Sequence, residues 1–235
     1  MNSKRILAIA SFIDSNDNLI DVGCDHGYLG IYLKLHNQVN DLLLTDLRPS
    51  ALNNAIENIK KYQLDIDTYL TDGIKGIKTK KYNTISISGM GTQTIIKILS
   101  ELKKKNTINK LIIQSNNDLD ILRSCINNMG YYLEDEITVY ENDIYYVICK
   151  FVKGQKKNTN EEIRFGLTRE DKVDYYTYLI EYYSSILKKI PKTNEDLISE
   201  LKSNIALLRK LLKECRYIII YFFCFFNFFF FIIIH

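Results

Sequence analysis

The chain has 235 residues, of which 46% are hydrophobic, 25% charged and 12% aromatic. This composition is typical of a soluble globular protein and excludes a disordered chain, a collagen or a disulfide scaffold. The formal net charge of +3 is too small to indicate nucleic-acid binding by itself. The charge is unevenly distributed, because residues 1–150 carry 17 basic and 18 acidic side chains while residues 151–235 carry 14 and 10. The C-terminal third is therefore better suited to face a polyanion.

Cysteines and histidines are dispersed, so the sequence predicts neither a disulfide framework nor a metal site. The three histidines are scattered and no two cysteines form a CxxC pair. The odd number of distant cysteines indicates reduced thiols in a cytoplasmic protein. The N-terminus reaches a charged residue at Lys4 and lacks a long apolar core, so a signal peptide is not expected.

The last part of the chain is a hydrophobic tail, residues 217–235, that differs from the rest. Its segment 217–234 reads YIIIYFFCFFNFFFFIII and contains no charged residue. Its 18 residues approach the roughly 20 that span a bilayer as a helix. The near absence of residue types other than Phe and Ile favours low-complexity sequence that follows the true domain, for example through a frame or stop-codon error. A membrane tail anchor and a packed core strand are the alternatives.

Residues 1–154 form the first predicted domain, because short apolar runs alternate there with helical patterns, as in an α/β domain with a parallel sheet. The segment Glu141-Asn142-Asp143 is a candidate hairpin turn between the last two strands. Strands are predicted over 18–23, 41–46, 67–70, 82–88, 110–114, 137–140 and 144–151, and helices over 29–35, 51–62, 94–104 and 119–129.

Residues 155–216 form the second predicted domain, and their pattern is helical only. Apolar residues recur at steps of three and four on both sides of Pro191. This spacing predicts two helices in an antiparallel hairpin, a short coiled-coil arm. The repeating positions are Val173, Tyr176, Ile180, Tyr183, Leu187 and Ile190, followed by Ile198, Leu201, Ile205, Leu208, Leu212 and Cys215.

The most informative motif is the loop after the first predicted strand, which reads D-V-G-C-D-H-G-Y-L from Asp21 to Leu29. Its glycines, beginning with Gly23, let the backbone approach a ligand at the N-terminus of a helix. A dinucleotide site would have G-x-G-x-x-G, whereas here Asp21 and Asp25 would repel a phosphate. S-adenosylmethionine, which carries ammonium and sulfonium charges, suits the loop better. The alternative is a tight turn with solvated acids.

Two further strand ends carry acids or glycine. Asp46 ends the second strand, where a carboxylate can accept hydrogen bonds from both hydroxyls of a ribose. Asp72 and Gly73 end the third strand, where an adenine amino group could be received. Since the carboxyl ends of parallel strands share one edge of the sheet, these residues predict a nucleoside-binding crevice.

The fourth and fifth strands end in possible substrate-binding loops. Gly89 and Met90 belong to a Gly-Met-Gly segment, which gives a permissive backbone beside a polarizable thioether. Gln114 and Asn116 offer amide groups that can pair with the edge of a base. A turn with a core methionine, and polar caps of the following helix, are the alternatives for the two loops.

Together these motifs resemble the bacterial TrmK family, tRNA (adenine-N1)-methyltransferases that modify adenine 22. The resemblance covers residues 4–118 in order and extends to the C-terminal arm. It implies a class I S-adenosylmethionine-dependent methyltransferase fold of Rossmann type. The sequence departs from the family at Cys24, Gly27 and Gly30, at Thr92 after Gly-Met-Gly, and at Ser115. These departures concern substrate recognition more than cofactor binding.

The resemblance also implies roles for individual residues. Asp25 is the expected catalytic carboxylate, which would stabilise the positive charge that arrives on adenine during methylation at N1. His26 would shape the base pocket, with a hydrogen-bonded structural histidine as the alternative. Arg5 would bind substrate or cofactor, unless it is a surface arginine of a helix. Competing functions are methylation of another RNA or of a small molecule, and a binding protein that has lost activity.

Overall fold

The structure is a computed structural model that describes residues 3–102 and 107–233, with side chains described as far as Ile218. The chain divides into two compact units, Met1–Arg164 and Phe165–His235. This division lies beyond residue 154, where the sequence predicts a domain boundary. The connecting segment stays with the first unit because the Asn158 side chain bonds the backbone N–H and C=O of Leu133, at 2.7 and 3.1 Å.

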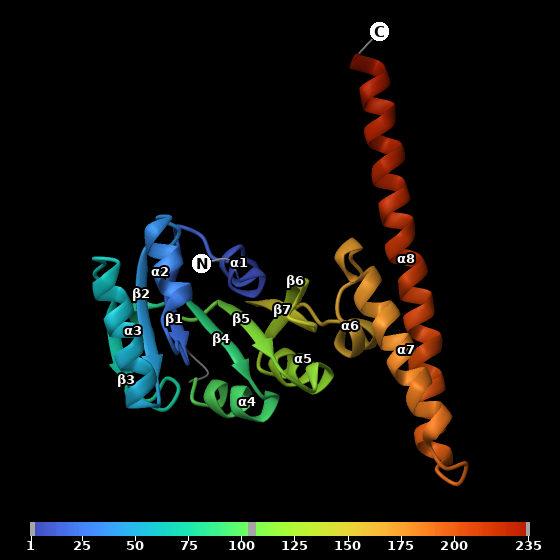
Figure 1. The fold of residues 1–235 in the computed structure, drawn as a ribbon, viewed down its shortest axis with the longest axis horizontal. Coiled ribbons are helices and arrows are strands. Elements are labelled where there is room, and N and C mark those ends of the chain that lie inside the picture. Colours follow the sequence, from blue (N-terminus) through green and yellow to red (C-terminus); the bar gives the residue numbers. More distant parts are fainter. Residues whose placement is uncertain (1–2, 103–106, 234–235) are drawn as a thin grey trace. The chain divides into compact units, whose positions relative to one another are not determined.

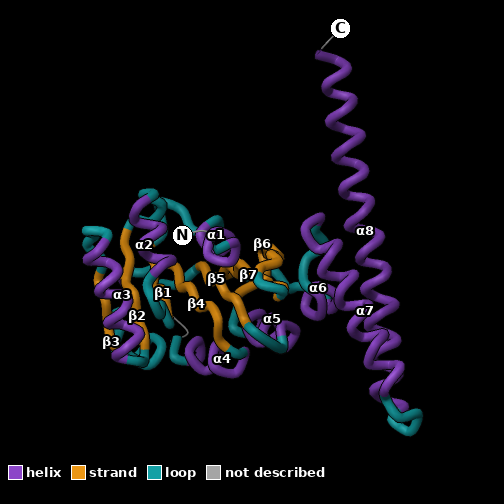
Figure 2. The backbone as a smooth tube through the Cα atoms, viewed as in Figure 1, coloured by secondary structure: helices purple, strands orange, loops and turns teal. Residues whose placement is uncertain are grey.

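The first unit contains a seven-stranded sheet in the order β3-β2-β1-β4-β5-β7-β6. The first five strands in this order run parallel, whereas β7 is antiparallel to both of its neighbours. The predicted α/β fold is therefore confirmed (Figures 1 and 2). The strands are β1 Asn18–Val22, β2 Asp41–Asp46, β3 Asp67–Leu70, β4 Thr84–Met90, β5 Lys110–Ser115, β6 Tyr131–Glu141 and β7 Ile144–Lys153.

Helices cover both faces of the sheet (Figure 1). The first three helices contribute to one buried cluster with the sheet, and α4 and α5 lie on the other face. The helix predicted after the fourth strand ends at Lys104, and this end lies outside the described residues. The helices of this unit are α1 Lys4–Ala10, α2 Tyr28–Leu35, α3 Pro49–Lys61, α4 Thr92–Ser100 and α5 Leu119–Asn128, and α6 Asn160–Phe165 ends at the first residue of the second unit. Helices α1 and α6 were not predicted from the sequence.

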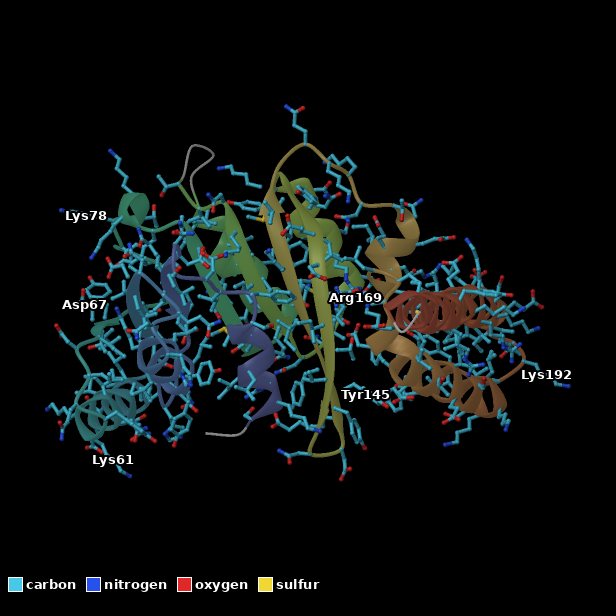
Figure 3. The ribbon with its side chains drawn as sticks, turned by 90° about the horizontal axis from the view of Figure 1, so that it is seen from above. Lys61, Asp67, Lys78, Tyr145, Arg169 and Lys192 are labelled. Carbon is cyan, nitrogen blue, oxygen red and sulfur yellow. The ribbon has the colours of Figure 1, made fainter. Side chains whose placement is uncertain are left out.

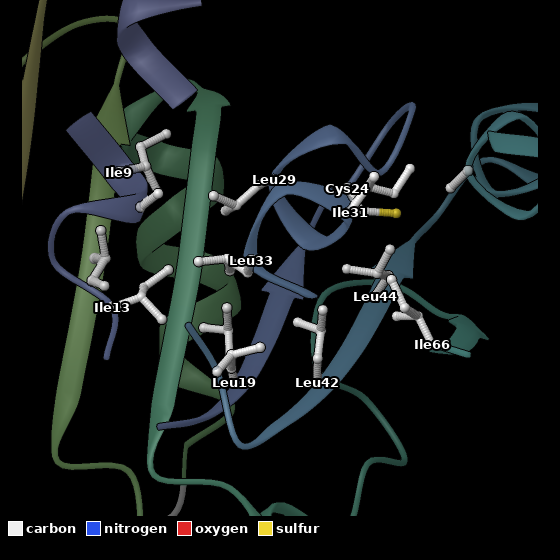
Figure 4. Packing of buried hydrophobic residues seen from close by; sticks show 14 of the residues in the cluster. Ile9, Ile13, Leu19, Cys24, Leu29, Ile31, Leu33, Leu42, Leu44 and Ile66 are labelled. Atoms are coloured by element: carbon white, nitrogen blue, oxygen red, sulfur yellow. The ribbon is translucent and has the colours of Figure 1, made fainter. Parts of the chain in front are cut away.

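The apolar core holds helix α2 against strand β2 (Figure 4). Leu42 and Leu44 point to the same face of β2 and are almost fully buried. A Cβ atom added to Gly30 of α2 would come within 2.7 Å of the Leu44 side chain. Helix and strand therefore pack at a distance that only glycine permits at this position. This contact fixes the N-terminus of α2, which follows the predicted ligand-binding loop.

A tight turn joins β6 and β7. Asn142 and Asp143 both have a left-handed backbone, with φ of 51° and 61°, and Glu141 pairs with Ile144 across the turn. Two consecutive residues of this conformation make the type I′ turn that matches strand twist in hairpins. The predicted hairpin is confirmed, although β6 begins earlier than predicted, at Tyr131.

The second unit contains an antiparallel pair of helices, α7 Val173–Lys189 and α8 Glu195–Ile233, as the apolar spacing predicts. Residues 217–233 continue α8, so the interpretation of the tail as a packed strand was wrong. Among the residues that the structure describes, none of the helices is long and apolar enough to cross a membrane. Side chains buried between the helices include Tyr176, Leu201, Ile205, Leu208, Leu211 and Cys215.

Candidate active site

A cavity of about 570 Å³ lies at the carboxyl ends of the parallel strands. This volume is within the usual range for small-molecule sites. Most of the sequence-predicted site residues come together in its wall. These are Arg5, Asp21, Gly23, Asp25, His26, Asp46, Asp72, Gly73, Gly89 and Met90.

The loop after β1 is shaped by three residues with a left-handed backbone. Gly23, Asp25 and Gly27 have φ values of 74°, 48° and 72°. The backbone N–H groups of Gly23 and Cys24 both donate to the carbonyl of Thr45 in β2, at 2.8 and 2.9 Å. These bonds tie the loop to the neighbouring strand. The loop therefore has a defined conformation at the mouth of the cavity.

Gly23 lies against the side chain of Met90. A Cβ atom built on Gly23 would lie 2.2 Å from the Met90 methyl carbon. No other residue could occupy this position without displacing the thioether. The loop after β1 therefore lies close to the end of β4, where Met90 is the last residue.

Asp46 is the buried acid at the centre of the site, with 4% of its surface exposed. Its Oδ2 accepts the backbone N–H of Asp25 at 3.1 Å, and its Oδ1 accepts that of Arg48 at 2.9 Å. Each carboxylate oxygen retains further acceptor capacity because it can accept more than one hydrogen bond. The two oxygens are thus held in place and can receive the two hydroxyls of a ribose.

Asp21 is also buried, at 4% exposed, and lies near Asp46. Burial raises the pKa of Asp21 to about 7, and the negative charge of Asp46 adds to the shift. Two adjacent carboxylates favour a cationic ligand, because a cation relieves their mutual repulsion. This electrostatic environment fits the positive charges of S-adenosylmethionine and would disfavour a phosphate.

Asp72 and Gly73, which follow β3, also line the cavity. Asp72 accepts a 2.6 Å hydrogen bond from Lys75, and this bond, together with the charge of Lys75, lowers the pKa of the Asp72 carboxyl. Gly73 has a φ of 67°, and its carbonyl accepts a hydrogen bond from Thr45 Oγ1 at 3.3 Å. The carboxylate is therefore ionised and available to accept from an amino group.

Asp25 and His26 lie at the open side of the cavity. The Asp25 side chain is 56% exposed, and its oxygens lie 3.5 Å from Arg48 Nη2 and 3.7 Å from His26 Nε2. The His26 ring stacks on Tyr28 with centroids 5.5 Å apart. Asn58 of α3 donates to the His26 carbonyl at 3.0 Å. A carboxylate and a stacked pair of rings thus lie side by side in the cavity wall.

Gln114 and Asn116 have a different position from the one that the sequence suggests. Gly89 N–H donates to Gln114 Oε1 at 3.0 Å, Gln114 Nε2 donates to Asn116 Oδ1 at 3.1 Å, and Asn116 Nδ2 donates to the Gly89 carbonyl at 2.9 Å. Within the described part of the chain, neither amide side chain belongs to the cavity wall. Their substrate contact stays a prediction, while the structure shows them bracing the Gly89 backbone.

Sequence reasoning missed Arg48 and Leu47. Arg48 lies within 3.6 Å of Asp46 and 3.5 Å of Asp25, and Leu47 is 62% exposed at the cavity. Their position directly after the acid that ends β2 was the available signal, because residues there face the same crevice.

Within the described residues, no group of three His, Cys, Asp or Glu side chains could hold a metal ion.

The fold is that of a class I methyltransferase, and the comparisons with known proteins agree. The chain belongs to the family described as a methyltransferase domain, whose profile matches residues 2–149. Within this family it is related to the TrmK proteins over nearly its whole length, so the predicted resemblance is confirmed.

Three relatives illustrate this similarity. The tRNA (adenine(22)-N(1))-methyltransferase of Bacillus subtilis is 24% identical over 229 residues, covering 89% of this chain and 96% of the relative. The structure of M. capricolum TrmK in complex with S-adenosyl-homocysteine is 29% identical with a TM-score of 0.79, covering 91% of this chain and 98% of that one. A Streptococcus pneumoniae structure in complex with S-adenosyl-L-methionine is 27% identical with a TM-score of 0.79, covering 90% and 100%.

Proposed function

We propose that this protein transfers a methyl group from S-adenosylmethionine to N1 of adenine 22 in tRNA. The activity for which the B. subtilis relative is named and the bound cofactors of the two solved relatives support this function. The geometric support is the hydrogen bond between Asp25 N–H and Asp46. This bond connects Asp46, whose carboxylate is suited to the cofactor ribose, with Asp25, whose carboxylate is suited to the base. Both residues line the same cavity.

The residues present fit the cofactor. Asp46 offers two fixed oxygens to the ribose, Asp72 can receive the adenine amino group, and Gly23 allows close approach of the backbone. When bound, S-adenosylmethionine supplies an electrophilic methyl group on a sulfonium. Asp21 and Asp46 provide the negative potential for its positive charges.

Asp25 stabilises the adenine that accepts the methyl group. Adenine N1 carries a lone pair, so no general base is needed to create the nucleophile. Methylation leaves a positive charge on the adenine ring, and the Asp25 carboxylate stabilises that charge as it develops. His26 and Tyr28 offer a stacked aromatic surface beside it. Because N1 is on the pairing edge, adenine 22 must leave its place in the tRNA fold to reach this surface.

Gly89, Met90 and Arg5 complete the proposed substrate side. Gly89 has a φ of 76° and is braced by the Gln114 and Asn116 amides, and a Cβ atom built on it would lie 3.9 Å from Arg5 Nη1. The guanidinium of Arg5 lies over the Tyr146 ring at 5.0 Å and borders the cavity. It is therefore positioned to contact a phosphate or a base of the incoming RNA.

The helical arm, residues 155–216 in the sequence-based division, is the proposed tRNA-holding part. Its surplus of basic residues complements the near-neutral catalytic part.

A tRNA substrate also implies a cytoplasmic protein, as cysteine usage predicts. We assign residues 217–235 no role in catalysis, and a membrane association would follow only if this tail is an anchor.

Methylation of unmodified tRNA, followed by nuclease digestion and mass spectrometry of the nucleosides, tests the proposal. We expect one N1-methyladenosine per tRNA with S-adenosyl-homocysteine as the co-product. Methylation of another RNA or of small metabolites instead of tRNA would favour the alternative substrate classes. Absence of any methyl transfer, despite binding of S-adenosyl-homocysteine, would favour a binding protein that has lost activity.

A further inference from the structure

Helix α1 forms one wall of the active-site cavity through Arg5, Ile6 and Ile9. The helix has seven residues, too few to be stable without support from the rest of the protein. Its C-terminal half is supported by the core, where Ala8, Ile9 and Ala10 are buried. Its N-terminal half, which carries Arg5, needs a separate support.

Two groups give this support: the Ser3 side chain, whose Oγ accepts the backbone N–H of Ile6 at 3.3 Å, and the carboxylate of Glu141 at the end of β6. Glu141 Oε1 accepts the backbone N–H of Lys4 at 2.8 Å, and Oε2 accepts Ser3 Oγ at 2.9 Å and the backbone N–H of Arg5 at 3.4 Å. Partial burial opposes ionisation of Glu141, but the hydrogen bonds from Ser3, Lys4 and Arg5 outweigh it and lower the pKa of the carboxyl. One ionised carboxylate thus binds the first turn of α1.

The position of Glu141 is set by the hairpin, which also supports the Arg5 side chain. The left-handed residues Asn142 and Asp143 fix the turn that directly follows Glu141. Tyr146 of β7 lies under the Arg5 guanidinium, with 5.0 Å between the guanidinium carbon and the ring centroid. The hairpin therefore holds Arg5 at two points, through the backbone by Glu141 and through the side chain by Tyr146.

We infer that Glu141 is a positioning residue for the transferase reaction, which holds Arg5 of α1 at the cavity. It does not itself belong to the cavity wall in the described residues. Its effect on tRNA therefore passes through Arg5. This inference rests on the proposed function for its effect on tRNA, whereas the binding of α1 by Glu141 can be measured in the absence of substrate.

Hydrogen exchange and steady-state kinetics on the full-length Glu141→Ala variant test the inference. Amide exchange at Lys4 and Arg5 should accelerate by about tenfold or more, because their acceptor is lost. The value of kcat/KM for tRNA should fall about three- to thirtyfold, the range expected for loss of an N-terminal helix contact. Glu141→Gln, which keeps one carbonyl acceptor, should lose less. Glu134→Ala is the control, since Glu134 lies on the same strand and pairs with Lys150.

A double-mutant cycle separates positioning from a general loss of structure. If Glu141 acts through Arg5, the Arg5→Ala/Glu141→Ala protein should match Arg5→Ala in kcat/KM within about twofold. Additive losses, or unchanged exchange at Lys4 and Arg5, would overturn the inference. If the wild-type protein does not methylate tRNA, the proposed function fails, and the exchange experiment alone still decides whether Glu141 holds α1.

Discussion

Asp46 and Asp25 are connected by one hydrogen bond but have different proposed roles, cofactor binding and methyl transfer. Single substitutions can separate these roles. Asp46→Ala removes the acceptor for the cofactor ribose, and each lost hydrogen bond to a charged group is worth about 1.5–3 kcal/mol. We expect the dissociation constant of S-adenosyl-homocysteine, measured by calorimetry, to rise at least about tenfold. Asp41→Ala is the control because Asp41 begins the same strand and pairs with Lys81 at its other end. Unchanged affinity of the Asp46 variant would contradict the assignment.

Asp25 should matter for the transfer step more than for folding or cofactor binding. Asp25→Asn removes the charge, and asparagine tolerates the left-handed backbone found there. We expect kcat to fall about 100-fold or more, as for loss of one electrostatic stabiliser, with a cooperative thermal transition retained. Asp143→Asn is the matched control, since Asp143 is also left-handed but lies in the β6–β7 turn. Turnover near the wild-type rate would exclude this role.

The buried carboxyl of Asp21 predicts a pH effect on stability. Its pKa rises from 3.8 to about 7 in the folded chain, so the folded state binds one more proton between these values. The contribution of Asp21 to the free energy of unfolding therefore falls as pH rises from about 4 to about 7 and is constant above.

Asp21→Asn should remove this pH dependence. The stability of the variant relative to wild type should increase across the window by at most about 1.4 kcal/mol per pH unit. Urea unfolding at a series of pH values measures this difference. A relative stability that does not change between pH 4 and pH 7 would show that Asp21 titrates normally.

At the scale of elements, the loop after β1 meets the end of β4 where Gly23 lies against Met90. Gly23→Ala should destabilise the protein by about 1 kcal/mol through its left-handed φ and should also displace Met90. Gly130→Ala is the control because Gly130 has a φ of 89° with no atom within 4 Å of an added Cβ. Thermal melts should show similar destabilisation in both variants, whereas only Gly23→Ala should lose cofactor affinity and methyl transfer. Equal activity of the two would contradict the proposed contact.

Much of the fold follows from local sequence. Strands β2 and β3 have the bounds that the sequence predicts, and Glu141-Asn142-Asp143 predicted the hairpin, because these signals depend on a few adjacent residues. Helices α1 and α6 were not predicted, since both are short and depend on distant partners. Glu141 binds the N-terminus of α1, and Asn158 together with Arg123 binds the segment around α6.

The candidate site shows the same limit of local reasoning. The acids and glycines predicted at the strand ends all lie in the cavity wall, because parallel strands bring their carboxyl ends to one edge of the sheet. The bracing of Gly89 by Gln114 and Asn116 depends on neighbouring strands and was not visible in the sequence. Among the positions that depart from the TrmK motifs, Cys24 lies in the cavity wall and Gly30 packs against Leu44.

At the scale of the whole molecule, the arm should contribute affinity for tRNA. Lys188, Lys189 and Lys192 are exposed at or beside the turn between α7 and α8, where Figure 3 shows Lys192 pointing outward. Replacing all three by Ala should weaken tRNA binding, and the slope of log affinity against log salt should become shallower by about 0.7–0.9 for each lost phosphate contact. Filter binding at several salt concentrations measures both quantities.

The control for the arm is Lys60→Ala/Lys61→Ala, which removes two lysines from the last turn of α3 in the catalytic unit. S-adenosyl-homocysteine affinity should be unchanged in the arm variant, because the cavity lies entirely in the first unit. If the arm variant binds tRNA with wild-type affinity and salt dependence, the lysines are simply solvated and the helices have a structural role.

The most direct test of the central claim is methylation of two matched tRNA transcripts with isotopically labelled S-adenosylmethionine, one natural and one in which guanine replaces adenine 22. The full-length protein should transfer one methyl group to the natural transcript, and mapping by mass spectrometry should locate it on N1 of adenine 22. The guanine-substituted transcript should accept none. Equal incorporation into both transcripts, or a methyl group at any other nucleotide, would contradict the proposed activity.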